Sequence, residues 1–257
     1  HWDAAGVLAD HAVGGDRVAG VEGEGAVRAR DLQADAVRAG LVLAGEDGYR
    51  FLHDRVQQAA CSLLPDAERG ELHLRIGRLL LARTPPAERP GRLFEIVTHL
   101  LQGASQMSTQ QERQQLARLC LDAGQRARSS AAFVSAVRLF TDGIAQLGSD
   151  GFSLDPELAF SLHFGLAECA FLTGELERAD QLLLDLLPRT SNELSIAEIY
   201  RVRVDLHITK GQMQRAAEIG LQGLRLFGVD LPAHPSREQV QREYEDVLVN
   251  LGSRTIE

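Results

Sequence analysis

Lysine is almost absent from this sequence. Of its 27 basic residues only Lys210 is a lysine, and all the others are arginines. A phosphate-binding P-loop needs Gly-x4-Gly-Lys-Ser/Thr, and a protein kinase needs a lysine on its third strand, because the amine neutralises nucleotide phosphates. Lys210 lies between "DLHIT" and Gly211 and fits neither motif. We therefore expect no nucleotide-hydrolysing core here, and we expect this segment by itself not to be an enzyme.

Cysteines are few, and long apolar runs are missing. Cys61, Cys120 and Cys169 are odd in number and far apart, and each lies in an apolar helical pattern. This spacing suits neither a disulfide framework nor a zinc site, so it predicts reduced core residues of a cytoplasmic protein. No apolar run approaches the ~20 residues that cross a bilayer, and we expect no membrane partner. The lack of an initial methionine and of a signal peptide predicts an excerpt of a longer polypeptide.

Positive charge is also in deficit. The formal net charge is −9, whereas binding along nucleic acid requires a cationic face that neutralises phosphates. We therefore expect no nucleic-acid partner. Apolar residues make up 44% of the 257 residues, which is ample for a buried core in one or two domains.

The first 53 residues are predicted to be a winged-helix-like remnant with one β-hairpin. "ARDLQADAVRAG" (29–40) has the pattern of a short helix ending at Gly40. The "GEDG" turn (45–48) between two apolar segments predicts a β-hairpin at 41–52. The helix could contact DNA, but Arg30, Asp31, Asp35 and Arg38 nearly balance in charge, which favours a packing role. We assign no structure to residues 1–30.

Residues 54–257 follow a helical pattern throughout. Apolar residues recur at spacings of three and four, and prolines and glycines separate the segments. Very short turns between neighbours predict antiparallel helix pairs. The expected helices are 54–64, 66–83, 92–102, 109–128, 131–147, 155–173, 175–188, 192–210, 212–227 and 236–251.

The helix pairs are related to one another by an internal repeat. "GELERA" (174–179) and "GQMQRA" (211–216) share Gly-x-apolar-x-Arg-Ala, and "AAFVSA" (131–136) is a weaker copy. The glycines allow the chain to reverse sharply, and the alanines allow two helices to approach closely. A period of about 34–40 residues is typical of tetratricopeptide-like repeats. We therefore predict an all-α fold, a tetratricopeptide-like α-solenoid over 54–257 that continues beyond the last residue.

His53 and Asp54 could form a catalytic pair, a phosphorylation site or a hinge between two modules. The phosphorylation motif lacks its proline, and no third catalytic group is visible. We favour the hinge, in which Asp54 caps the following helix and His53 closes the hairpin. We expect no catalytic, cofactor-binding or metal site, because the other helical histidines lie singly on separate helices: His73, His99, His163 and His207.

A protein or peptide ligand is expected on the first helix of each pair, which lines the concave face of tetratricopeptide-like arrays. Two aromatic residues among charges could anchor a peptide there. The alternative is that Phe164 and Phe171 fill the core between neighbouring pairs. The predicted partner-binding residues are Arg118, Gln125, Arg128, Phe164, Glu168, Phe171, Glu198, Arg201 and Asp205.

Residues 49–86, "YRFLHDRVQQAACSLLPDAERGELHLRIGRLLLARTPP", resemble the region that follows the ATPase core in large bacterial STAND-type signalling proteins. The likeness continues through "RLFEIVTHLLQGA" (92–104), "AGQRARSSAAFVSAVRLFTDGIAQL" (123–147) and "AAEIGLQGLRLFGVDLPAHPS" (216–236). Such proteins often run from a serine/threonine-kinase-like domain through the ATPase to tetratricopeptide-like repeats, a GAF domain and a histidine kinase. Others end in a nucleotide cyclase or a DNA-binding domain.

The resemblance implies a placement for the segment. Its Phe-x-His-Asp stretch would join the winged-helix part of the ATPase to a helical arm, which agrees with a hinge at His53 and Asp54. ATP and magnesium would belong to the parent protein, an ATPase-containing histidine or serine/threonine kinase, and none of their binding motifs falls on residues here. The implied partners are the neighbouring ATPase and kinase domains of the same chain. The alternatives are the equivalent arm of an ATP-dependent transcription regulator or nucleotide cyclase, and a stand-alone tetratricopeptide adaptor.

Overall fold

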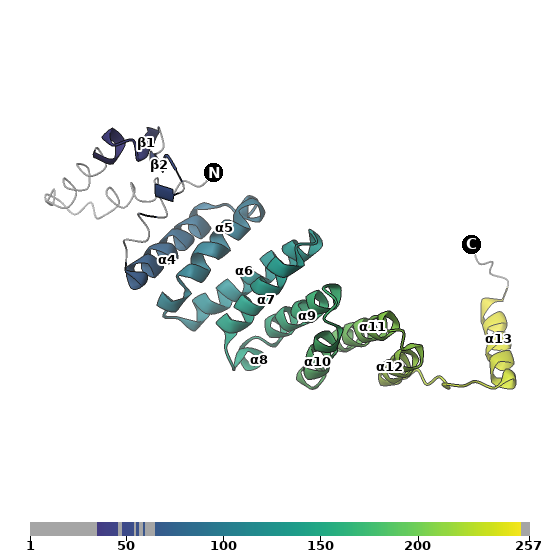
Figure 1. Cartoon of the computed structure of the whole chain (residues 1–257). Coiled ribbons are helices and arrows are strands. Elements are labelled where there is room, and N and C mark those ends of the chain that lie inside the picture. Colours follow the sequence, from purple (N-terminus) through teal and green to yellow (C-terminus); the bar gives the residue numbers. More distant parts are fainter. Residues whose placement is uncertain (1–34, 46–47, 54, 57–58, 60–64, 253–257) are drawn as a thin grey trace. The chain divides into compact units, whose positions relative to one another are not determined.

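The computed structural model describes residues 35–45, 48–53, 55–56, 59 and 65–252 (Figure 1). The chain divides into two compact units, residues 1–112 and residues 113–257. The expected boundary between residues 53 and 54 lies inside the first unit and stays a prediction.

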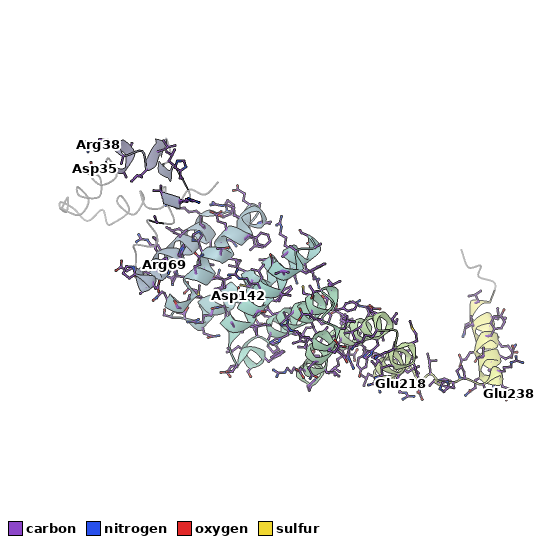
Figure 2. All side chains as sticks on the ribbon, viewed as in Figure 1. Asp35, Arg38, Arg69, Asp142, Glu218 and Glu238 are labelled. Atoms are coloured by element: carbon purple, nitrogen blue, oxygen red, sulfur yellow. The ribbon has the colours of Figure 1, made fainter. Side chains whose placement is uncertain are left out.

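The first unit begins, in its described part, with a short helical turn and two strands. Residues 35–38 are helical, Arg38 pairs with Asp35 at 2.6 Å (Figure 2), and Gly40 has a φ of 66°. Strands β1 (Val42–Gly45) and β2 (Gly48–Phe51) pair antiparallel, with Val42 opposite Phe51. The strands lie within the range expected for a hairpin. The winged-helix remnant stays a prediction, since residues 1–34 lie outside the described part.

Two helices pack closely in the rest of the first unit. Helix α4 (Asp66–Arg83) follows Pro65, and α5 (Arg89–Gln102) carries Pro90 in its first turn, where no intrahelical donor is needed. Helix α5 therefore begins three residues earlier than expected. A Cβ on Gly103 would lie 2.6 Å from Leu74, so only glycine permits this approach. Helix η1 (Ala104–Gln106) follows, and the core contains Leu74, Ile76, Leu93, Ile96, Val97 and Leu100.

The second unit contains a series of helix pairs. Helix α9 packs on both α7 and α10, and α11 packs on both α10 and α12. The short helices α8 and η2 were not expected, whereas the bounds of the long helices agree with expectation within a few residues. The elements are α6 (Gln110–Ser129), α7 (Phe133–Leu147), α8 (Gly151–Leu154), α9 (Pro156–Leu172), α10 (Leu176–Leu186), η2 (Leu187–Arg189), α11 (Glu193–Thr209), α12 (Met213–Leu226) and α13 (Arg237–Leu251).

Three pairs of the second unit share one turn geometry. Ala131, Gly174 and Gly211 have φ values of 57°, 84° and 72°. In each turn, the following residue donates its backbone N–H to the carbonyl five positions earlier, as Glu175 does to Ala170 at 2.9 Å. This is the Schellman arrangement, in which a left-handed residue satisfies the last helical carbonyls. The repeat read from the sequence therefore corresponds to a repeated backbone conformation.

Small residues allow the helices of the second unit to meet. The repeat alanines Ala136, Ala179 and Ala216 are all buried, as their spacing predicts. The fully buried ring of Phe140 in α7 lies against Gly124 of α6 and Gly165 of α9, where a Cβ would come within 2.5 Å and 2.7 Å of ring carbons. An aromatic ring thus fills the space that two glycines leave between three helices.

The expectation of an all-α fold after residue 65 is confirmed for the described residues, which contain no strand there. Of the expected helix 54–64, residues 55, 56 and 59 are described and are helical, whereas the cap at Asp54 lies outside the described residues. No described helix is long and apolar enough to cross a membrane.

Candidate interaction face

The nine predicted partner-binding residues lie on three helices of the second unit. Each of these helices, α6, α9 and α11, is the first of its pair. Arg118, Gln125 and Arg128 lie on α6, Phe164, Glu168 and Phe171 on α9, and Glu198, Arg201 and Asp205 on α11.

Four of the nine residues form a chain of ion pairs, which we call the charge row: Arg128, Glu168, Arg201 and Asp205. Glu168 on α9 is its centre, because its carboxylate contacts Arg128 of α6 and lies 3.7 Å from the guanidinium of Arg201 on α11. Arg201 also lies 3.4 Å from Asp205, one turn further along α11. The charge row therefore connects the first helices of three successive pairs.

The aromatic residues do not form an exposed anchor in this face. Phe164 is only 8% exposed and stacks on Phe160 with ring centroids 5.6 Å apart. It packs in a core cluster with Leu183, Leu186 and Ile199, and Phe171 is half-buried against the same cluster. Phe164 therefore fills the core between neighbouring pairs, as the alternative interpretation predicted. Residues of α10 and α11 cover this side chain.

Arg118 has a structural partner at the beginning of α9. Its guanidinium lies 2.7 Å from Asp155, whose other oxygen accepts the backbone N–H of Leu158 and caps the helix. Partial burial favours the protonated acid, but the hydrogen bonds from Arg118 and Leu158 outweigh it and lower the pKa of Asp155. Gln125 is exposed on α6, and Glu198 is exposed on α11.

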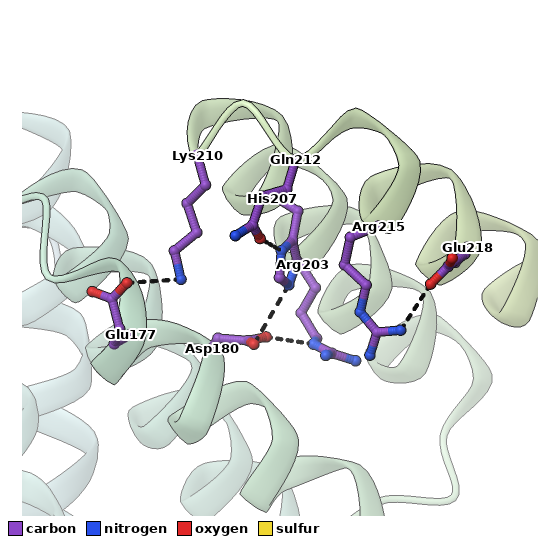
Figure 3. A network of polar contacts seen from close by, with 8 residues as sticks. All are labelled: Glu177, Asp180, Arg203, His207, Lys210, Gln212, Arg215 and Glu218. Atoms are coloured by element: carbon purple, nitrogen blue, oxygen red, sulfur yellow. Dashed lines mark hydrogen bonds and ion pairs between the residues drawn. The ribbon is translucent and has the colours of Figure 1, made fainter.

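A second polar network, which sequence reasoning missed, lies among α10, α11 and α12 (Figure 3). Arg203 is 5% exposed, and its Nε donates to the Asp180 carboxylate at 2.7 Å. Buried His207 lies 2.7 Å from Gln212 through Nδ1, and its Nε2 is 3.5 Å from Asp180. The sequence signal was available, because Arg203 interrupts the apolar series Ile199, Val202 and Leu206 on the buried face of α11.

This network adds paired charges to the apolar contacts that connect α10 to α11. Lys210, the only lysine of the chain, lies 2.9 Å from Glu177 at the end of the same face (Figure 3). A charge that is buried with its partner is tolerated, whereas the same charge without the partner is strongly destabilising. A register of α10 on α11 that separated Asp180 from Arg203 would therefore be destabilised.

The histidines that were expected to lie singly have aromatic or polar neighbours in space. Nδ1 of His73 on α4 lies 2.9 Å from Nδ1 of His99 on α5, so one ring donates to the other. Burial, and then the neighbouring His73, lower the pKa of His99 to about 4. His163 packs on Phe152 at 5.3 Å, and burial followed by nearby Arg189 lowers its pKa. The sequence could not join residues 73 and 99, because their contact depends on how α4 and α5 pack.

The two described cysteines lie in the core. Cys120 and Cys169 are fully buried, and burial raises the pKa of the Cys120 thiol to about 12. A thiol with so high a pKa is a poor nucleophile. No group of three metal-ligating side chains occurs among the described residues.

The described residues form a helical segment in which ion pairs connect neighbouring helices. The chain is similar to part of a signalling kinase. It is 25% identical over 232 residues to hybrid signal transduction histidine kinase G of Dictyostelium discoideum. The match covers 81% of this chain and 7% of that protein, so the chain spans a small part of the relative's length. No protein-family model matches the chain. No solved structure matches it.

Proposed function

We propose that this chain is a regulatory, protein-binding arm of a multidomain signalling protein, built as a tetratricopeptide-like solenoid. The similarity to the histidine kinase carries the proposal, because it extends over most of this chain. The three equivalent turns at Ala131, Gly174 and Gly211 support the repeat architecture. In the parent protein, the arm would lie between a STAND-type ATPase and a histidine or serine/threonine kinase, in the cytoplasm, with ATP and magnesium bound outside this segment.

The charge row is the surface that would bind the neighbouring domain or a protein ligand. Arg201 remains 58% exposed although it pairs with Glu168 and Asp205. The pair between Arg201 and Asp205 is exposed on both sides, and exposed ion pairs contribute about 0–1 kcal/mol, so a partner can replace this pair at little cost. A partner segment with alternating acidic and basic residues fits this row, since the row itself alternates in sign from α6 to α11. Gln125, Glu198 and Arg118 extend the same face.

The experiment uses the complete polypeptide that carries this segment and measures autophosphorylation from labelled ATP. We expect Arg201→Glu to change the autophosphorylation rate by about five-fold or more, a coupling of about 1 kcal/mol. Arg215→Glu is the matched control, because Arg215 on α12 is similarly exposed and pairs with its own helix neighbour Glu218 at 3.0 Å. Circular dichroism checks that both variants keep their helices.

The outcomes separate the alternatives. Equal autophosphorylation of wild type, Arg201→Glu and Arg215→Glu contradicts the role of the charge row. A complete polypeptide with a cyclase or DNA-binding output instead of a kinase supports the equivalent arm of those regulators. A reading frame that encodes this segment alone supports the stand-alone adaptor.

A further inference from the structure

Helix α13 carries an apolar stripe on one of its faces. Val240, Tyr244, Val247 and Leu248 recur at helical spacing and are all about half exposed, and none of the residues of α13 is buried. Val249 lies on the opposite face and is 78% exposed. The helix is well specified locally, because Ser236 and Gln239 form a capping box at its beginning. A stable helix with such a stripe requires an apolar surface to cover it.

Helix α12 presents an apolar surface on the side away from its buried residues. Met213, Ala217, Leu221 and Leu224 lie along one side of α12, and Met213 and Leu224 are exposed. The buried side of the same helix, with Ala216 and Ile219, packs on α11. Helix α12 thus has one covered and one uncovered apolar face.

The uncovered face of α12 is equivalent to faces that bind the next helix elsewhere in the second unit. When the turns at Ala131, Gly174 and Gly211 are aligned, Ala217 of α12 takes the same position as two earlier residues. These residues are Val137 of α7 and Asp180 of α10. Val137 packs against the cluster that α9 completes, and Asp180 binds Arg203 of α11. At each of these two earlier positions, the following first helix covers the face.

The connection to α13 is long enough for the same packing. Residues 148–155 connect α7 to α9, and residues 187–192 connect α10 to α11, and both pairs of helices are in contact. The linker 227–236 is longer than either. An extended chain spans about 3.3 Å per residue, whereas packed helix axes lie about 8–10 Å apart, so the linker does not prevent docking.

We propose that the apolar stripe of α13 docks on the uncovered face of α12 in the same molecule. The short linker keeps α13 at an effective concentration near the millimolar range, which favours this contact over docking to a second copy at micromolar protein. A stripe of a few side chains is also too small for a stable dimer interface by itself. The inference does not depend on the proposed signalling function.

The test is hydrogen exchange of the whole 257-residue chain, with peptides from α12 and α13 resolved by mass spectrometry. We expect protection of both helices in the wild type. Val247→Asp should reduce protection of α12 by about ten-fold, because it places a charge in the buried contact. Val249→Asp is the matched control, with the same substitution two residues away on the opposite face, and should leave α12 protection unchanged.

A pair of opposite charges placed across the proposed contact provides a second test, which does not depend on helix propensity. Leu224→Lys should release α13 as Val247→Asp does, and the two substitutions together should restore protection of both helices. Failure of the double variant to recover overturns the proposal, as does equal exchange in Val247→Asp and Val249→Asp. Protection that rises with protein concentration, together with a dimeric mass in light scattering, also overturns it in favour of a second copy.

Discussion

Acid should weaken the first unit through the histidine pair of α4 and α5. Between pH 7 and pH 5 the unfolded chain takes up protons on histidine, whose ordinary pKa is 6.5, whereas folded His99 has a pKa of about 4. The unfolded state therefore binds more protons in this window, and the free energy of unfolding falls as the pH falls. The stabilising contribution of neutral His99 is complete above pH 6.5 and is lost towards pH 4.

The magnitude follows from the two pKa values. Linkage between 6.5 and about 4 predicts a loss of about 2 kcal/mol on going from pH 7 to pH 5. The charges around the pair act in both directions. Burial lowers the pKa of His73, and the charge of Arg69 lowers it further. Glu95 acts in the opposite direction and partly offsets the decrease in the pKa of His99. His99 is 4% exposed, so solvent screening does not remove the effect.

The assay is urea unfolding followed by circular dichroism at pH 7, 6 and 5, for the wild type and two variants. His99→Asn removes the titrating ring but keeps a polar group near the position of Nδ1, so it should lose about 2 kcal/mol less than the wild type over this range. His234→Asn, which changes an exposed linker histidine, should keep the full pH dependence. The reasoning is refuted if the wild type and His99→Asn lose the same stability between pH 7 and pH 5.

Three further outcomes are expected. Gly165→Ala should lower the free energy of unfolding by about 1–3 kcal/mol, because the added Cβ would meet the confined ring of Phe140. Gly91→Ala should not destabilise the chain, because the space around its added Cβ is open. Thermal melting measures both variants. Arg203→Met should cost about 3 kcal/mol by removing the guanidinium that pairs with the Asp180 carboxylate, and adding Asp180→Leu should restore most of that stability in urea titrations. The chain should not bind ATP, and saturable magnesium-dependent binding at micromolar concentration in calorimetry would contradict the absence of a phosphate-binding loop.

Much of the helical fold could be predicted because its signals are local. Pro65, Gly148 and the Asp155–Pro156 step mark helix ends, since a missing N–H, a positive φ or a capping carboxylate acts within one turn. The turns at Gly174 and Gly211 could be read for the same reason, and both have positive φ. Helix α5 begins three residues before the expected 92–102, because the first turn of a helix accepts Pro90.

The candidate face could be predicted in part. The positions of the turns placed Arg128, Glu168 and Arg201 on the first helix of each pair, and these side chains do lie close enough to form ion pairs. Phe164 could not be assigned to surface or core, because that choice depends on whether a neighbouring helix covers its side of α9. The contact that covers it comes from residues 183–199, distant along the chain.

The sequence by itself determined the helices, their turns and the absence of a phosphate-binding lysine motif, because propensity, capping and motif spacing act over a few neighbouring residues. Only the tertiary structure decided which distant polar groups meet. His73 meets His99, and Asp180 meets Arg203, because helices pack in one particular register. A shift of that register by one residue turns a side chain by about 100° around its helix, so contacts of this kind are decided by packing and not by the local pattern.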